Sequence, residues 1–455
     1  MANTYLSRTI STATNEYKGT LSWWQKGMST DSTQYILACE SGNERLLWYG
    51  TSGRFQGGLR ASSTPPDIDF TLSGTPRFRD PNAWYHCVLA WDSTQSSASD
   101  RIKYYVNNIQ YTISGSGTGG VNDVPQNHVM PMNKSGLPFR IGSTIGGGSY
   151  YEGVISHMHF VDGTQYTPST FGETDSTTGE WKIKEDPSGI TYGNNGFWWL
   201  KDTNAATDSS PNSNTPSIGG AGLTKTEDCP SNVFATLNPL DQAHISTKPT
   251  IAYGNTQWTA SGNSTSNCSI RGTIGASSGK YYFEVKLLEA TNQLIGVDCP
   301  DVAGAWYDNT GYMGNHSGFY AILINSTDTI RSVVAGSGGG TDLGTVTNND
   351  IIGCAFDFDN GKFYFSKNGS WLNSGDPTSG STGTGSFGNL ASGLYVPAIT
   401  NYSYGTASST AFNFGNGYFG TTAVSSAGTN ASGNGIFEYD VPTGYTALST
   451  KGLNL

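Results

Sequence analysis

Residues 350–369 read D-I-I-G-C-A-F-D-F-D-N-G-K-F-Y-F-S-K-N-G, a pattern that predicts a β-hairpin. The Asn360-Gly361 pair at its centre is typical of a two-residue type I′ turn, in which both central residues need a positive φ. The predicted cross-strand pairs are Asp359 with Lys362, Phe358 with Phe363, Asp357 with Tyr364 and Phe356 with Phe365.

Directly opposed residues share one face of a sheet. The four phenylalanines of the hairpin therefore lie on one face, which we expect to be buried. The other face carries Asp357, Asp359, Lys362 and Tyr364, and we expect it to be wet, with an ion pair between Asp359 and Lys362. A strand pair with one buried and one wet face is typical of an antiparallel sandwich.

The composition of the chain favours an all-β protein. At 455 residues the chain is long enough for two to three domains. Charged residues make up 13%, about half the usual share. Glycine (60 residues) and small polar residues are abundant, and so are tyrosine (25), phenylalanine (19) and tryptophan (11). This aromatic content is too high for a disordered chain, because it buries enough apolar surface to offset the ordering of the backbone.

The charge pattern argues against nucleic acid as a partner. The net charge is −11, and no cluster of five or more Lys and Arg residues exists to neutralise phosphates. We expect no membrane insertion, because no apolar run reaches 18 residues, and the first residues do not resemble a signal peptide. The six cysteines are scattered, which favours free thiols; one disulfide among Cys229, Cys268 and Cys299 is the alternative.

The first third of the chain carries a family resemblance. Residues 84–92, W-Y-H-C-V-L-A-W-D, and 102–108, I-K-Y-Y-V-N-N, resemble the central hairpin of concanavalin A-like, laminin-G-like jelly rolls. Residues 139–142, F-R-I-G, and 151–163 resemble the closing strands of that family. The resemblance implies a jelly roll over residues 1–172.

A connecting segment follows at residues 173–248. Within it, residues 196–200, G-F-W-W-L, predict a strand docked on the first domain, and residues 202–217 have the composition of a loop. Residues 232–240, N-V-F-A-T-L-N-P-L, form a bridge to the next domain.

The last part of the chain resembles the SPRY family. Residues 279–285, G-K-Y-Y-F-E-V, match a strand of that family, and residues 411–415, A-F-N-F-G, and 442–448, P-T-G-Y-T-A-L, match its closing motifs. The hairpin at 350–369 falls between them. The resemblance implies a SPRY-like sandwich over residues 249–455, so the fold class is all-β, with two tandem antiparallel β-sandwiches.

The sequence offers weak signals for chemistry. Glu173, Asp175 and Glu180 come nearest to the carboxylate pattern of a retaining glycosidase, but the spacing is two residues too long and the segment reads as a loop. His157 and His159 would share one strand face, and we expect two solvent-facing histidines rather than a metal pair. We predict no catalytic residue, no metal ligand and no cofactor; Ca²⁺ stays open as an alternative that is not placed on any residue.

Two loops have the composition of a carbohydrate-binding site. One contains Trp306, Tyr307, Asp308, Asn309 and Tyr312, and the second contains Trp48, Tyr49 and Arg54. Flat aromatic rings stack on sugar faces, while polar side chains bind hydroxyl groups. The alternative is that these aromatics pack between domains or protomers.

The whole arrangement is similar to virion proteins of marine tailed phages, often described as tail fibres. The resemblance implies a non-enzymatic homotrimer, made in the host cytoplasm, that binds host polysaccharide or lipopolysaccharide. A decoration or structural protein of the head or tail, in contact with other virion proteins, is the second interpretation. A glycan-cleaving enzyme is the third.

Overall fold

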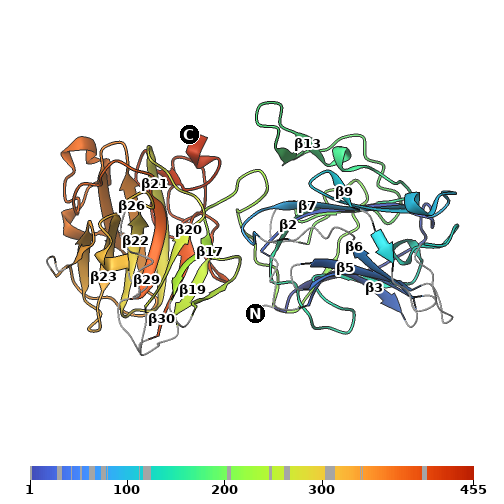
Figure 1. Cartoon of the computed structure of the whole chain (residues 1–455), viewed down its shortest axis with the longest axis horizontal. Helices are drawn as coiled ribbons and strands as arrows, with labels where there is room; N and C mark the ends of the chain where they lie inside the picture. The colour runs from blue at the N-terminus through green and yellow to red at the C-terminus, as the bar shows by residue number, and fades with distance from the viewer. Residues whose placement is uncertain are drawn as a thin grey trace. The chain divides into compact units, whose positions relative to one another are not determined.

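The computed structural model divides the chain into two compact units, residues 1–225 and 226–455, which are described separately (Figure 1). The segment expected to connect two domains is thereby shared between them, 173–225 with the first unit and 226–248 with the second. The described residues are 3–27, 33–41, 44–51, 54–60, 67–72, 78, 80–111, 113–115, 124–201, 206–244, 248–260, 267–302, 313–338, 340, 342–401 and 407–454.

The first unit is built from two antiparallel sheets that form two layers (Figure 1). One has the order β10-β6-β5-β4-β3-β11-β1-β16, and the other β15-β12-β2-β7-β8-β9. The strands of the first sheet are β1 (Tyr5–Thr9), β3 (Gln34–Ser41), β4 (Glu44–Thr51), β5 (Arg54–Arg60), β6 (Asp67–Leu72), β10 (Ile113–Gly115), β11 (Pro138–Ile141) and β16 (Ser217–Gly219). Those of the second are β2 (Lys18–Lys26), β7 (Tyr85–Asp92), β8 (Ile102–Val106), β9 (Ile109–Tyr111), β12 (Val154–Asp162) and β15 (Phe197–Trp199).

The core of this unit is rich in aromatic rings, among them Trp23, Trp91 and Trp199. The strand predicted at residues 196–200 is present as β15, which pairs with β12. The hairpin of β13 (Gly172–Thr174) and β14 (Trp181–Ile183) forms a small separate sheet. The ring of Trp181, from β14, stacks on His86 of β7, so this hairpin contacts the outer face of the six-stranded sheet.

The second unit is also a two-layered antiparallel sandwich (Figure 1). One sheet has the order β17-β20-β29-β22-β23-β24-β25, with β17 (Leu237–His244), β20 (Cys268–Gly272), β29 (Val396–Asn401), β22 (Gln293–Asp298), β23 (Phe319–Ile324), β24 (Ile330–Val334) and β25 (Ser337–Gly338). The other has the order β18-β19-β30-β21-β26-β27-β28, with β18 (Thr250–Ala252), β19 (Gln257–Ala260), β30 (Ser408–Asn413), β21 (Lys280–Glu289), β26 (Ile351–Asp357), β27 (Lys362–Lys367) and β28 (Ser370–Trp371). A short strand, β33 (Thr446–Ala447), adds to β21 in parallel.

The predicted hairpin forms, but its register differs from the prediction by two residues. Asp357 faces Lys362 and Phe356 faces Phe363, which leaves residues 358–361 in the turn. Of these four residues only Gly361 has a positive φ, 63°. The Asp357 carboxylate accepts hydrogen bonds from Asn360 N (3.0 Å) and Nδ2 (2.8 Å) and so stabilises the longer turn.

The faces of the hairpin survive this change, because a shift of two residues keeps every side chain on its own face. The rings of Phe356, Phe363 and Phe365 are buried in the core between the two sheets, and Phe358 packs against its edge.

The prediction that the opposite face is wet was wrong for Asp357 and Tyr364, whereas Asp359 is exposed. Tyr364 is buried in a cluster with Phe437 and Tyr445, because a segment near residue 440 covers the sheet. Asp357 is 1% exposed, and its carboxylate pairs with Lys280 Nζ at 2.9 Å.

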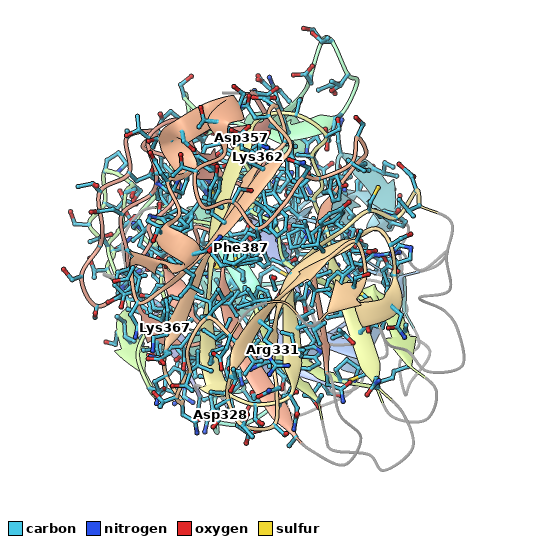
Figure 2. All side chains as sticks on the ribbon, turned by 90° about the vertical axis from the view of Figure 1, so that its left-hand side faces the viewer. Asp328, Arg331, Asp357, Lys362, Lys367 and Phe387 are labelled. Atoms are coloured by element: carbon cyan, nitrogen blue, oxygen red, sulfur yellow. The ribbon has the colours of Figure 1, made fainter. Side chains whose placement is uncertain are left out.

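The expected ion pair between Asp359 and Lys362 is wrong as well. Lys362 Nζ donates to Asn389 Oδ1 at 2.6 Å, while Asp359 accepts from Gly279 N. Figure 2 shows Lys362 beside Asp357, with Lys367 at the other end of the same strand.

The covering segment is fastened to the sheet by one buried carboxylate. Glu284, on β21, accepts hydrogen bonds from the backbone N–H groups of Glu438 and Tyr439, both at 2.8 Å. Asn413 Nδ2 (3.2 Å) and Tyr282 Oη (3.1 Å) also donate to it. In the part of the chain that the structure describes, no helix is long and apolar enough to cross a membrane.

Candidate functional site

The residues predicted for the first glycan-binding loop, Trp306, Tyr307, Asp308, Asn309 and Tyr312, lie outside the described residues. The backbone of Trp48 and Tyr49 belongs to β4, and that of Arg54 begins β5. The side chains of these three residues also lie outside the description. Both predicted glycan-binding sites therefore remain predictions. The structure does describe the residues that border the first of them.

Both borders of the 303–312 segment are tied to one histidine. His316 Nε2 lies 3.0 Å from the carbonyl oxygen of Val302, the last described residue before the segment. His316 N donates to the carbonyl of Met313 at 2.8 Å, in the short 3-10 helix η4 (Met313–Asn315) that follows the segment. Met313 itself is fully buried. His316 thus contacts the two described residues that border the segment, Val302 and Met313.

A buried charge network holds His316 in turn. Its Nδ1 is 2.6 Å from Asp298 Oδ1, at the end of β22. Arg271 of β20 donates to Asp298 Oδ2 through Nε (2.8 Å) and Nη2 (2.5 Å). Both ring nitrogens of His316 face oxygen atoms, the Asp298 carboxylate and the Val302 carbonyl group. A second carboxylate, that of Asp241, lies 3.9 Å from Arg271 Nη1 and helps to balance the charge.

The network gives the loop a rigid base, since every group in it has a partner of opposite charge or polarity. The sequence analysis missed it. The available signal was a charged residue, Arg271, inside a strand that reads C-S-I-R-G. A cation in such a strand needs a buried partner, but the sequence does not say which carboxylate supplies it.

The β26–β27 turn lies at the same end of the second sandwich as this network. Phe358 of the turn stacks on Tyr395 with ring centroids 5.4 Å apart, and Leu390 N donates to Gly361 O at 2.9 Å. The residue after Tyr395, Val396, is the cross-strand partner of Asp298. One end of the sandwich therefore brings together the borders of the aromatic loop and the hairpin turn.

The carboxylates considered for glycosidase chemistry form a surface cluster. Lys182 Nζ lies 3.1 Å from Asp175 and 3.5 Å from Glu173. Hydrogen bonds from the backbone N–H groups of Thr178 and Thr177, together with Lys182, hold the pKa of Asp175 well below its usual range. Asp175 is therefore charged at neutral pH, whereas a general acid must carry a proton.

The two histidines of β12 are buried, so the prediction that they face solvent was wrong. A β-bulge between Ser156 and His159 breaks the strand alternation, and His157 adopts a φ of 46°. His159 Nδ1 lies 2.8 Å from the hydroxyl of Tyr192, and its ring stacks on Trp198. Burial lowers the pKa of His159 well below its usual value. No group of three metal-ligating side chains occurs among the residues that the structure describes.

Comparison with known proteins agrees with this architecture. Residues 2–169 match the family model of the concanavalin A-like lectin/glucanases superfamily, and residues 280–416 match that of the SPRY domain. Similar solved structures include the SPRY domain of human HERC1, at 14% identity, covering 39% of this chain and 96% of that chain with a TM-score of 0.30. The PSpry domain of TRIM65 is 13% identical, with 39% and 91% coverage and a TM-score of 0.29.

The curated proteins contain no match to the sequence. Domains of the two matched families are typically non-catalytic and serve to bind other molecules. The chain thus folds into two tandem β-sandwiches, the first similar to concanavalin A-like domains and the second similar to SPRY domains.

Proposed function

We propose that this protein is a non-enzymatic component of a phage virion, part of a tail fibre or adhesin, that recognises glycan on the host surface. The ligand is a polysaccharide or lipopolysaccharide, contacted by loops at the ends of the sandwiches. The observation that carries the proposal is the buried network of Arg271, Asp298 and His316. It fixes both ends of the segment that contains Trp306 and its polar neighbours.

A fixed loop base favours binding because fewer degrees of freedom are lost when the ligand docks. In this proposal each single site binds the glycan weakly. A homotrimer presents three copies of each site, and joined sites raise the avidity by roughly 10²–10⁴-fold when the spacing fits the target. The other virion proteins hold the trimer in the particle.

The test is binding of the purified full chain to intact host cells, followed by a glycan array. Trp306→Ala should reduce cell binding by about tenfold or more, since a stacked aromatic ring contributes over 1 kcal/mol at a binding hot spot. Tyr105→Ala, which removes a half-buried ring from β8 in the first domain, is the matched control and should leave binding unchanged. If the unaltered chain does not bind intact host cells, the proposed adhesin function is wrong.

Two other results would favour a different function. Binding to assembled particles without binding to hosts favours a decoration or structural role. Release of sugar from host polysaccharide that is lost on Glu173→Gln favours an enzyme.

A further inference from the structure

A cavity of about 450 Å³ with both polar and apolar walls lies within the second unit. Its wall combines the start of β21, the β26–β27 turn and the covering segment near residue 440. The residues that matter for its chemistry are Ser278, Lys280, Tyr281, Asp359, Ser432 and Leu453. The volume is within the range of about 300–1,000 Å³ that is typical of small-molecule sites.

One hydroxyl group of the cavity, that of Tyr281, makes no hydrogen bond to the described residues. Tyr281 is 6% exposed, and its ring packs in the sandwich core against Phe358. Its Oη makes no hydrogen bond to any of the described residues and is open to solvent, so it is available to a ligand. A Cβ atom on Gly279 would approach this hydroxyl to 2.9 Å, so the glycine leaves the hydroxyl accessible from the cavity.

Burial raises the pKa of Tyr281, and the nearby Asp359 acts in the same direction. The phenol therefore keeps its proton at neutral pH and can both donate and accept a hydrogen bond.

Two charged side chains also line the cavity. Asp359 is exposed, and one of its carboxylate oxygens accepts from Gly279 N at 2.7 Å, which fixes its position at the rim. Lys280 Nζ is held 2.9 Å from Asp357 Oδ2 and lies over the ring of Tyr445. An ammonium group has three N–H donors, so Lys280 keeps donors for a ligand.

The charged side chains of the cavity indicate which class of ligand it binds. The ammonium group of Lys280 is already paired with Asp357, and the Asp359 carboxylate lines the same cavity, so a free anion gains little there. No three acidic or other metal-ligating groups meet here within the described part of the chain, which disfavours a metal ion. Fixed donors and acceptors suit a compound with several hydroxyl groups, which can both donate and accept hydrogen bonds.

We propose that this cavity binds one neutral sugar residue, with Asp359 accepting from its hydroxyl groups and with Lys280 and Tyr281 donating to its oxygens. The inference deepens the proposed function, on which it rests for the ligand class. It adds a subsite at the end of the sandwich that also carries the borders of the aromatic loop. The Leu453 side chain, 43% exposed, supplies an apolar contact for a sugar ring.

The experiment is saturation-transfer NMR on the full chain with methyl glycosides of glucose, galactose, mannose, N-acetylglucosamine and rhamnose at millimolar concentration. We expect at least one glycoside to give a signal that Tyr281→Phe and Asp359→Asn each reduce about fivefold, the loss of one hydrogen bond. Tyr281→Phe keeps the packed ring, and Asp359→Asn keeps an acceptor for Gly279 N. Tyr105→Phe, which removes a phenol hydroxyl from the first domain, is the matched control.

Thermal melting curves of each variant show whether the fold is intact. Signals that survive both substitutions, or no glycoside signal at all, would overturn the inference. A Tyr281-dependent signal from L-alanine, whose two charges complement Asp359 and Lys280, would overturn the sugar assignment.

The adhesin function and the sugar site in the cavity can be contradicted independently of each other. Host binding that depends on Trp306 but not on Tyr281 would contradict the sugar site in the cavity and support the adhesin function. A Tyr281-dependent glycoside signal without host binding would support the sugar site in the cavity and contradict the adhesin function.

Discussion

Trp181 donates its indole N–H to Nδ1 of His86 at 3.0 Å, across two separate sheets of the first domain. The imidazole lies between two indole rings, with Trp24 at 4.8 Å and Trp181 at 5.9 Å between centroids. An indole nitrogen only donates, so Nδ1 of His86 must be unprotonated, and Nε2 carries the proton toward Ser22 Oγ at 2.9 Å. The hairpin of β13 and β14 is thus held by a histidine that has to be neutral.

This contact predicts loss of stability of the first domain in acid. Burial lowers the pKa of His86 from 6.5 to about 3, so the unfolded chain binds a proton that the folded domain excludes. The stabilisation is complete above pH 6.5 and declines as the pH falls toward 3, by up to about 1.4 kcal/mol per pH unit. His159 is also buried with a lowered pKa, and it acts in the same direction.

Urea unfolding at several pH values, followed by tryptophan fluorescence, measures this dependence. His86→Phe keeps a ring between the indoles but cannot titrate, so it should flatten the pH slope between 6.5 and 5 while lowering stability at pH 7.5. Equal slopes for the variant and the unaltered chain would contradict the prediction.

The second domain should respond to pH with the opposite sign. Burial raises the pKa of Glu284 from 4.5 to about 7, although four donors act against the shift. The folded domain then binds a proton that the unfolded chain has released, so this contribution is complete below pH 4.5 and is lost as the pH rises through 7. Glu284→Gln should abolish that dependence.

The same substitution should also destabilise the domain by about 1–3 kcal/mol, because the new amide N–H group meets the N–H donors of Glu438 and Tyr439. Denaturant melts across pH 5–8 measure both effects. A glutamine variant that retains the pH slope of the unaltered domain would show that another group titrates.

Gly361 is the position where the hairpin turn requires glycine. Its φ is 63°, and a Cβ there would lie 3.1 Å from the carbonyl oxygen of Leu390. Gly361→Val should destabilise the second domain by about 1–3 kcal/mol and leave the first unchanged. Gly361→Asn should cost less, because asparagine tolerates a left-handed backbone. Calorimetry that shows both domains weakened together would speak against independent units.

Asp298 is the carboxylate on which Arg271 and His316 converge. Asp298→Asn removes the negative charge nearest to the buried Arg271 guanidinium group, and we expect a loss of about 3–5 kcal/mol from the second domain. Asp241→Asn is the control, because this partner is more exposed and lies 3.9 Å from Arg271, so its loss should be below about 1 kcal/mol. Chemical denaturation compares the two variants, and similar losses would mean that Asp298 is not the centre of the network.

The sequence predicted the faces of the hairpin better than its turn. Alternation alone put Phe356 and Phe365 on the core side, but the register depended on the Asp357 side chain, which stabilises a longer turn than Asn360-Gly361 indicates. Alternation likewise misplaced His157, because a bulge inserts an extra residue that leaves no local mark in the sequence.

Contacts between distant segments limited the prediction of the site. The outer face of β26 and β27 reads as polar, yet Phe437 and Tyr445 cover it from far along the chain. The sugar cavity has the same origin, since Gly279 and Asp359, which share a hydrogen bond in its wall, are 80 residues apart. Such a site has no motif, because its donors and acceptors meet only when the sandwich is complete.

The parallel pairing of β33 with β21 has a consequence for biosynthesis. Tyr281 and Tyr282 are translated long before Thr446 and Ala447, their partners in the sheet, and Glu284 likewise precedes its donors Glu438 and Tyr439. The strands of the first domain are all synthesised by Gly219. On the ribosome the first domain can therefore fold while the second domain is incomplete and exposes an apolar sheet. A chaperone would bind this incomplete second domain.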